Sequence, residues 1–181
     1  MPVTFTKTDR RYTVDYSKVS NGVQVTVFGK KNLAGNLLDS GGQPYNAGKV
    51  VNNAVQPFSN ESFSKTVAQG ASPSGKYITG YGMSGNDQVA IMWEDGKSIK
   101  FNYGNYPFIW GVNNGGVGVG TSIVNNMYVP VKFTKDGKTK LLPNHELGTG
   151  GLLYEVSPSG NVIVGSSSMR PDSMKGSNVL A

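Results

Sequence analysis

Three observations predict that this chain is all-β, with a small four-bladed, β-propeller-like repeat fold. Alternating apolar residues recur along the chain, and no long stretch shows the 3.6-residue period of a helix. A nine-residue sequence motif, which we call the turn phrase, occurs three times, as SPSGKYITG at 72–80, VNNGGVGVG at 112–120 and SPSGNVIVG at 157–165. Residues 2–7, PVTFTK, nearly repeat residues 130–135, PVKFTK. A turn followed by a β run, recurring about every 40–45 residues, is typical of propeller blades.

Each copy of the phrase has glycines at two fixed places, five residues apart. The first set is Gly75, Gly115 and Gly160, and the second set is Gly80, Gly120 and Gly165. We expect the first set to lie in equivalent hairpins that need a positive φ, which glycine adopts without steric cost. We expect the second set to allow two backbones to approach closely within the strands.

The two hexapeptides predict that the N- and C-terminal strands share one blade. In the order of the repeat, PVKFTK follows the turn phrase, yet PVTFTK precedes every copy of it. The last phrase ends at 165 and only sixteen residues follow it. We therefore expect the C-terminus to supply the inner strands of the last blade and residues 2–15 its outer strands. Such pairing removes free sheet edges and holds both termini in place.

The repeat divides the chain into four units within one domain, 1–181. A weaker turn phrase, Val19-Ser20-Asn21-Gly22, marks the first unit, and its extra length falls in residues 30–49, which we interpret as an inserted loop. The expected units are about 17–67, 68–104, 105–148, and 149–181 together with 1–16.

The three phrases resemble extracellular repeats of the HAF type. Those repeats have an Ile/Val-Asn/Ser-x-Gly turn, a β run that ends in Gly, and then an apolar-aromatic strand. The resemblance covers roughly residues 68–181 and little of 17–67. It implies propeller blades of a surface or secreted protein and no shared catalytic residue.

Composition narrows the class of protein further. The chain has 25 glycines, only 15% charged residues and no cysteine, so disulfides and cysteine-ligated zinc are excluded. The first ten residues show no signal peptide, and no apolar run is long enough to span a membrane. We expect a virion or extracellular surface location, reached by assembly rather than export, with a cytoplasmic location left open.

Catalytic chemistry finds little support in the sequence. The single histidine, His145, has no nucleophile motif near it and is interpreted as an exposed loop residue. Glu94, Asp95 and Glu155 could serve a glycosidase, which needs two carboxylates facing one cleft, but their spacing does not require it. We expect no enzyme activity, no cofactor and no metal. A carbohydrate-active hydrolase remains the alternative.

The segment 101–110, FNYGNYPFIW, is the densest aromatic run. Its aromatics are expected either to pack between neighbouring blades or to form a stacking platform for a sugar ring. We predict ligand contacts from Tyr103, Asn105 and Tyr106, together with the loop 30–49, because non-repeating segments are what a repeat fold leaves free for recognition.

Lysine and arginine exceed acids by 17 to 11. In the repeat register many fall on outer hairpins and would form a basic arc, namely Lys7, Arg10, Arg11, Lys97, Lys100, Lys132, Lys135, Lys138 and Lys140. They either block edge-to-edge aggregation or bind an anionic partner.

The function predicted is a non-enzymatic binding or assembly module that presents loops to a glycan or a protein partner. It is expected to work as a homo-oligomer, and a phage tail or virion accessory protein is the role that fits the composition by analogy. A secreted lectin-like adhesin is the other alternative to the hydrolase.

Overall fold

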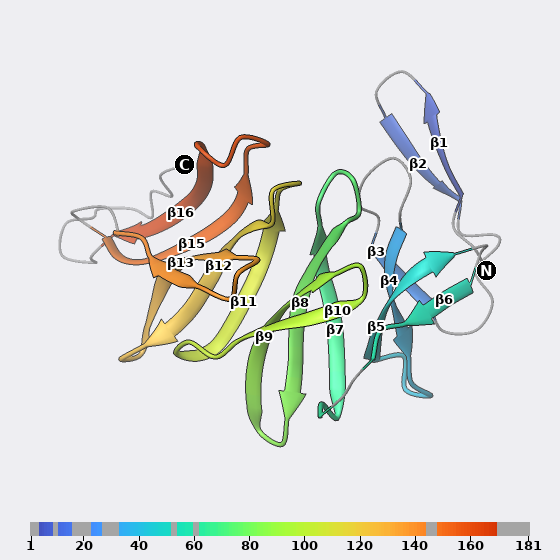
Figure 1. Cartoon of the computed structure of the whole chain (residues 1–181), viewed down its shortest axis with the longest axis horizontal. Helices are drawn as coiled ribbons and strands as arrows, with labels where there is room; N and C mark the ends of the chain where they lie inside the picture. The colour runs from blue at the N-terminus through green and yellow to red at the C-terminus, as the bar shows by residue number, and fades with distance from the viewer. Residues whose placement is uncertain are drawn as a thin grey trace.

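The structure is a computed structural model that describes residues 4–8, 11–15, 23–26, 33–51, 54–59, 62–143 and 148–169. All regular elements in this part of the chain are β-strands, as the sequence predicts. They form three four-stranded antiparallel sheets and two separate hairpins, and neighbouring strands in each sheet are consecutive in the chain. The sheets stand side by side in the order of the sequence (Figure 1). Each sheet has the strand order of a propeller blade.

Sheet 1 consists of β3 (Val23–Thr26), β4 (Leu33–Leu38), β5 (Pro44–Val51) and β6 (Ala54–Pro57). Sheet 2 consists of β7 (Lys65–Ala71), β8 (Tyr77–Ser84), β9 (Asp87–Glu94) and β10 (Lys97–Phe101). Sheet 3 consists of β11 (Asn105–Val112), β12 (Val117–Val124), β13 (Met127–Thr134) and β14 (Thr139–Leu141). The N-terminal hairpin pairs β1 (Thr4–Thr8) with β2 (Arg11–Asp15), and the C-terminal hairpin pairs β15 (Gly148–Val156) with β16 (Ile163–Met169).

The repeated phrase forms the turn between the first two strands of sheets 2 and 3 and of the C-terminal hairpin. The amide of Gly75 donates to the carbonyl of Ser72, and that of Gly160 donates to Ser157 in the same way. Both glycines have positive φ, 70° and 78°, as predicted.

In the middle copy of the phrase the glycine with positive φ is Gly116, at 73°, and not Gly115. The amide of Gly116 donates to the carbonyl of Asn113, so Asn113 takes the place of the first serine of the other two phrases. This turn is one residue shorter than the others, because the amide of Asn113 bonds to Val117, whereas that of Ser72 bonds to Tyr77. The prediction for Gly115 was therefore wrong by one residue.

The second set of glycines lies beside a bulge in the inner strand. Pairing with the second strand shifts register between Ala68 and Gly70 in β7, and at the equivalent places in β11 and β15. A Cβ on Gly80 would clash with the carbonyl oxygen of Val67. Gly120 meets Phe108, and Gly165 meets Leu152, in the same way. The predicted close approach is confirmed at all three glycines.

The segment 30–49 is not an inserted loop. Residues 33–38 and 44–51 are strands β4 and β5 of sheet 1, joined by a tight turn in which Gly42 has a φ of 76°. Its core side chains are small: Ala34 and Ala47 are fully buried, and Asn36 is 2% exposed. Small and polar residues hide the apolar alternation that identifies a strand, which explains the error. The turn phrase at 19–22 lies outside the described residues.

Among the strands that the structure describes, the expected shared blade is not formed. β1–β2 and β15–β16 are separate two-stranded sheets, and they lie at opposite ends of the row of sheets (Figure 1). The physical reason lies in how neighbouring sheets meet. Their inner strands are already in contact, since a Cβ on Gly70 would clash with the backbone of Trp110. The outer strands are held by aromatic packing of Phe101 on Phe133, with ring centroids 5.2 Å apart.

The core lies between the sheets and not within a barrel. One cluster, centred on Tyr77, Met92, Phe101, Ile109 and Phe133, fills the space between sheets 2 and 3. A second cluster, including Ala34, Ala47, Ile78, Ile91 and Trp93, joins sheets 1 and 2.

Buried polar groups join neighbouring sheets as well. The side-chain amide of Asn36 bonds both the amide and the carbonyl of Ala68, at 2.7 and 3.1 Å. The hydroxyl of Thr121 donates to the carbonyl of Gly151 in the C-terminal hairpin, at 3.1 Å. These bonds satisfy buried groups that would otherwise oppose folding.

Replacing Gly120 with alanine should lower the free energy of unfolding, because the new methyl group would clash with the carbonyl of Phe108. We expect a loss of about 1–3 kcal/mol or more, as for other overpacked sites. Gly115→Ala is the control, since a Cβ there is 3.3 Å from its nearest neighbour, the side chain of Asn113. Chemical denaturation of the two variants tests this, and equal stability would contradict it.

Candidate functional site

A polar pocket opens where the β8–β9 turn meets the β10–β11 connection. Its cavity volume is about 530 Å³, within the range of small-ligand sites. We call it the amide pocket, and its lining residues are Ser84, Asn86, Asp87, Gln88, Val89, Asn102, Gly104, Asn105 and Tyr106. Four of these side chains are amides and one is a carboxylate. Such groups offer paired donors and acceptors at fixed positions.

Two of the three residues predicted from the sequence line this pocket. Asn105 and Tyr106 do so, but Tyr103 is packed against the hydrophobic cluster between sheets 2 and 3. The backbone of this connection is fixed by Ser122, whose hydroxyl donates to the carbonyls of Tyr103 and Asn105 at 2.6 and 3.1 Å. The segment 30–49 was also predicted to contact ligand. Its strands, β4 and β5, contribute no residue to the described lining of the pocket.

Sequence reasoning missed the contribution of the β8–β9 turn. The turn reads SGNDQ at 84–88, a run of small and polar residues between two strands. Such a run identifies a turn but not which other turn it will face. The pairing of β8 with β9, in which Ser84 lies opposite Asp87, brings this turn to the same end of sheet 2 as the β10–β11 connection.

Tyr106 is held in a strained conformation. Its φ is 47°, a region that tyrosine rarely adopts, and it follows Gly104, whose φ is 64°. It lies in a register shift of β11 between Asn105 and Phe108. The side-chain amide of Gln88 donates a hydrogen bond to the backbone carbonyl of Pro107 at 2.8 Å. The result is a tyrosine side chain that is 52% exposed at the rim of the amide pocket. Bulges often redirect a side chain in this way next to functional sites.

The other aromatics of the segment 101–110 pack on rings or apolar side chains of the protein itself. Phe108 stacks on Trp110 and Trp110 stacks on Tyr154, with centroids 5.7 and 5.6 Å apart. Tyr81 meets Phe108 edge-on at 5.7 Å. These rings join sheets 2 and 3 to the C-terminal hairpin, and Phe108 and Trp110 are partly buried in the stack, whereas Tyr154 at its end is 48% exposed. Tyr106 is therefore the aromatic of this segment that a ligand can reach most readily.

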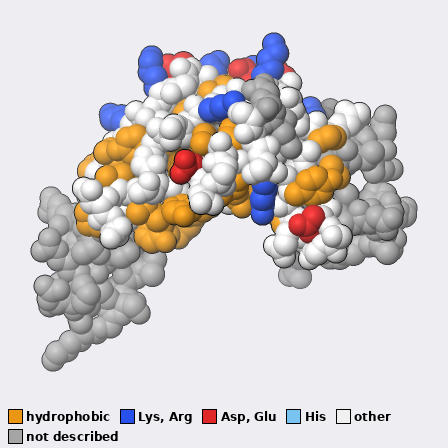
Figure 2. Space-filling model, turned by 90° about the horizontal axis from the view of Figure 1, so that it is seen from below, with side chains coloured by type: hydrophobic (Ala, Val, Ile, Leu, Met, Phe, Trp, Pro, Cys, Tyr) orange, Lys and Arg blue, Asp and Glu red, His pale blue; other side chains and the backbone are white. Residues whose placement is uncertain are grey.

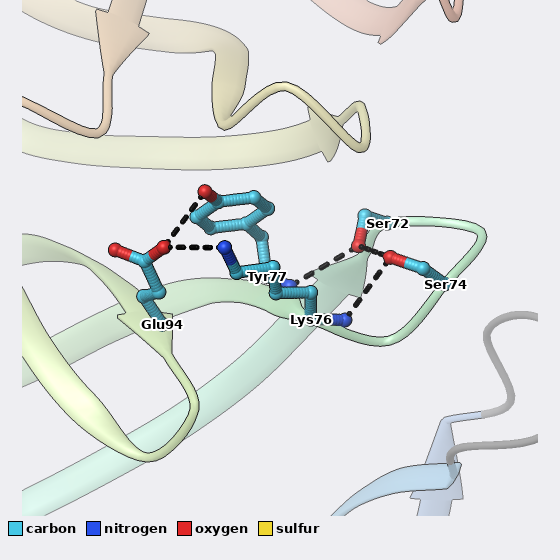
Figure 3. Close-up of polar contacts among 5 residues, drawn as sticks. All are labelled: Ser72, Ser74, Lys76, Tyr77 and Glu94. Carbon is cyan, nitrogen blue, oxygen red and sulfur yellow. Dashed lines mark hydrogen bonds and ion pairs between the residues drawn. The ribbon is translucent and has the colours of Figure 1, made fainter.

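A second pocket, of about 430 Å³, is lined by Glu94, Asp95, Lys97, Ile99 and Lys135. At its edge the carboxylate of Glu94 accepts a hydrogen bond from the Tyr77 hydroxyl and pairs with the Lys76 ammonium, both at 2.9 Å (Figure 3). The bond from Lys76 lowers the pKa of Glu94, and the bond from Tyr77 adds to this effect. The same pair raises the pKa of Lys76.

The Lys76–Glu94 ion pair is positioned by the turn phrase at 72–80, which contains Lys76. Ser72 and Ser74 lie in the turn that precedes Lys76, and their hydroxyls are 3.2 Å apart (Figure 3). The Ser72 hydroxyl accepts the amide of Tyr77, and the Ser74 hydroxyl accepts the amide of Lys76. The arrangement fixes the turn against strand β9, so we interpret it as structural.

The three acidic residues considered for a hydrolase, Glu94, Asp95 and Glu155, do not line one common pocket. Glu155 is not among the residues that line the pocket of Glu94 and Asp95. His145 lies outside the described residues. Within the described ranges, no group of three or more potential metal-ligating side chains occurs.

The lysines of the predicted basic arc that fall in sheets 2 and 3 lie on or beside the outer strands, as the repeat register predicts. Lys97 and Lys100 are on β10, and Lys132 and Lys140 are on β13 and β14. Lys and Arg side chains gather along the convex rim of the arched molecule (Figure 2). Lys138 pairs with Asp136 at 2.8 Å and, with a bond from Thr134, lowers the pKa of that carboxyl to about 2. The side chains of Lys7, Arg10 and Arg11 lie outside the described part.

Comparison with known proteins leaves the family open. No protein-family model matches the chain, and no curated protein matches it. Among solved structures, it is similar to the crystal structure of TolB from Acinetobacter baumannii, with 14% identity and a TM-score of 0.49. The match covers 77% of this chain and 39% of that one. Across the described residues no helix is both long and apolar enough to cross a membrane.

Replacing Tyr106 with glycine should give a more stable protein than replacing it with alanine. Glycine accepts a positive φ, whereas alanine keeps the strain, which is worth about 1–2 kcal/mol. Gly115 has no positive φ, so at this position the alanine variant should be at least as stable as the native glycine. Thermal unfolding measures both pairs, and equal stability of the two Tyr106 variants would show that no strain is stored there.

The Lys76–Glu94 pair should stabilise the fold in a defined pH window. Because the pKa of Glu94 is lowered on folding, its contribution is present above its ordinary value of 4.5 and is lost as pH falls through the folded pKa. Because the pKa of Lys76 is raised on folding, the contribution of Lys76 to stability is present below its ordinary pKa of 10.5 and is lost as pH rises through the folded pKa.

Glu94→Gln should therefore lower the melting temperature at pH 7 and lose that effect in acid. Asp87→Asn, at the other end of the same strand β9, is the control. A Glu94→Gln penalty that persists unchanged at pH 2 would show that the charge pair is not its cause.

Proposed function

We propose that this protein is a non-enzymatic carbohydrate-binding module and that the amide pocket is its ligand site. The observation that supports the proposal is the convergence of Asn86, Gln88, Asn102 and Asn105 with an exposed tyrosine in one cavity. Amide groups bond the neighbouring hydroxyls of a sugar, and a tyrosine face packs on the apolar side of its ring.

Preorganisation supports the same assignment. The strained backbone at Tyr106 is fixed by Gly104, Gln88 and Ser122, so little conformational entropy remains to be lost when a ligand binds. Among the described lining residues, Asp87 is the single carboxylate and none is a lysine or arginine. Neutral sugars fit this charge pattern better than acidic ones.

The proposed architecture is that of four blades for each chain. Sheets 1 to 3 supply three of them, and the two hairpins are the inner and outer halves of the fourth. The resemblance to HAF-type repeats supports a role on an extracellular or virion surface, where several weak sites in one assembly would act together.

Glycan binding by the full chain should depend on Tyr106. On a glycan array followed by calorimetry with the free sugar, Tyr106→Ala and Asn86→Ala should each weaken affinity about tenfold or more, which corresponds to about 1.4 kcal/mol. Tyr128→Ala is the matched control, because Tyr128 is 51% exposed but does not line the amide pocket. Glycan binding that survives both pocket variants would reject the site, and absence of any glycan ligand would reject the function.

A further inference from the structure

The C-terminal hairpin ends the row of sheets with an open edge. In sheets 2 and 3 the second strand, β8 or β12, has a partner on both sides. Its counterpart β16 pairs with β15 alone, among the strands that the structure describes. An edge strand with free backbone groups is a template for pairing with another strand.

The face of this hairpin is uncovered as well. Val162 and Val164 are 61% and 51% exposed. In the register of the turn phrase they correspond to Tyr77 and Thr79 of sheet 2, which are 1% and 0% exposed because sheet 3 covers them. Val119, the counterpart of Val164 in sheet 3, is fully buried. Positions that receive the next sheet elsewhere in the fold thus face solvent here.

The N-terminal hairpin has the complementary defect. β1 overlaps the hexapeptide PVTFTK, which matches PVKFTK at 130–135 in and after β13, and β2 pairs with β1 as β14 pairs with β13. β13 and β14 are the outer strands of sheet 3, and β13 pairs with β12. The hairpin β1–β2 is therefore an outer half without an inner one, at the far end of the row (Figure 1).

The packing between the sheets opposes closure within one chain. Bringing the ends together would tighten the arch, but Gly70 and Gly111 already place inner strands against the backbones of Trp110 and Tyr154. Opening the outer side instead would separate Phe101 from Phe133. The molecule is arched, with its hollow side visible in Figure 2, and the two hairpins lie at opposite ends of the row of sheets (Figure 1).

We propose that a second copy of this chain completes the open blade, by adding its β1–β2 hairpin to strand β16. The sheet that follows in the second copy, β3–β6, then covers Val162 and Val164 as the next blade. Two copies that exchange hairpins reciprocally close a ring with four blades from each, in which β16 is no longer an edge strand. Strand addition of this kind gains backbone hydrogen bonds along the whole edge.

The register of the exchange follows from sheet 3. There Lys132 of β13 lies opposite Val119 of β12. The counterparts of these residues are Thr4 and Val164, so Thr4 of one copy should lie opposite Val164 of the other. Cysteines at directly opposed positions of antiparallel strands lie within disulfide distance.

Single-cysteine variants of the full chain test the exchange, because the native chain contains no cysteine. Thr4→Cys and Val164→Cys are mixed, unfolded, refolded together and oxidised. A disulfide-linked dimer that contains one chain of each variant is expected on non-reducing gels. Thr4→Cys mixed with Tyr128→Cys, an equally exposed position on another hairpin, should give no such product.

Light scattering on the native protein gives an independent measurement. A mass of at least twice 19.2 kDa supports the exchange. A monomer in which the double variant Thr4→Cys/Val164→Cys forms its disulfide within one chain would overturn it in favour of closure by the same chain. A monomer without that disulfide would overturn strand addition altogether. Glycan binding does not enter either readout, so these results stand apart from the proposed ligand site.

Discussion

The close contact of two backbones inside sheets 2 and 3 is the constraint on which the rest of the structure depends. A glycine on the second strand, Gly80 or Gly120, leaves room for the bulged inner strand beside it. The bulge then turns Gly70 or Gly111 toward the next sheet, where absence of a side chain lets the two inner strands touch. Contact on the inner side and aromatic packing on the outer side together determine the curvature of the arch.

The amide pocket depends on a different kind of strain. Gly104 and Tyr106 both have positive φ, and together they reverse the chain as it leaves β10 and enters β11. The strain is tolerated because Ser122 and Gln88 bond the surrounding carbonyls. Residues of the repeat thus provide a rigid support, and one non-repeating connection supplies the shape of the pocket. Strain at an exposed aromatic side chain is more readily explained by recognition than by stability.

Repetition made much of the fold predictable from the sequence. Three copies of one phrase identify equivalent turns, and Gly80, Gly120 and Gly165 follow from their place after each turn. Prediction failed where the pattern weakens. The residue pair Gly115-Gly116 offers two candidates for one positive φ, and only the hydrogen bond to Asn113 shows which is used. In sheet 1, Ala34 and Ala47 fill a core position with so little apolar surface that alternation could not be recognised.

The lining of the amide pocket was only partly predictable from the sequence, for a reason that applies to repeat folds in general. Asn105 and Tyr106 stand out because they interrupt the repeat, whereas Asn86 and Gln88 lie in an ordinary hairpin turn. That turn gains its role from facing the connection to the next sheet, which is a property of how β8–β11 are arranged in space.

The same reasoning separates recognition from assembly in this molecule. The amide pocket draws on one end of sheet 2 and on the connection to sheet 3, and its described lining residues include none from β16. Residues at the open edge can therefore change without altering the pocket, and pocket residues can change without altering the edge. A repeat protein that closes through a second copy would gain a second pocket from the same operation. Assembly would then raise avidity without any change in the affinity of a single site.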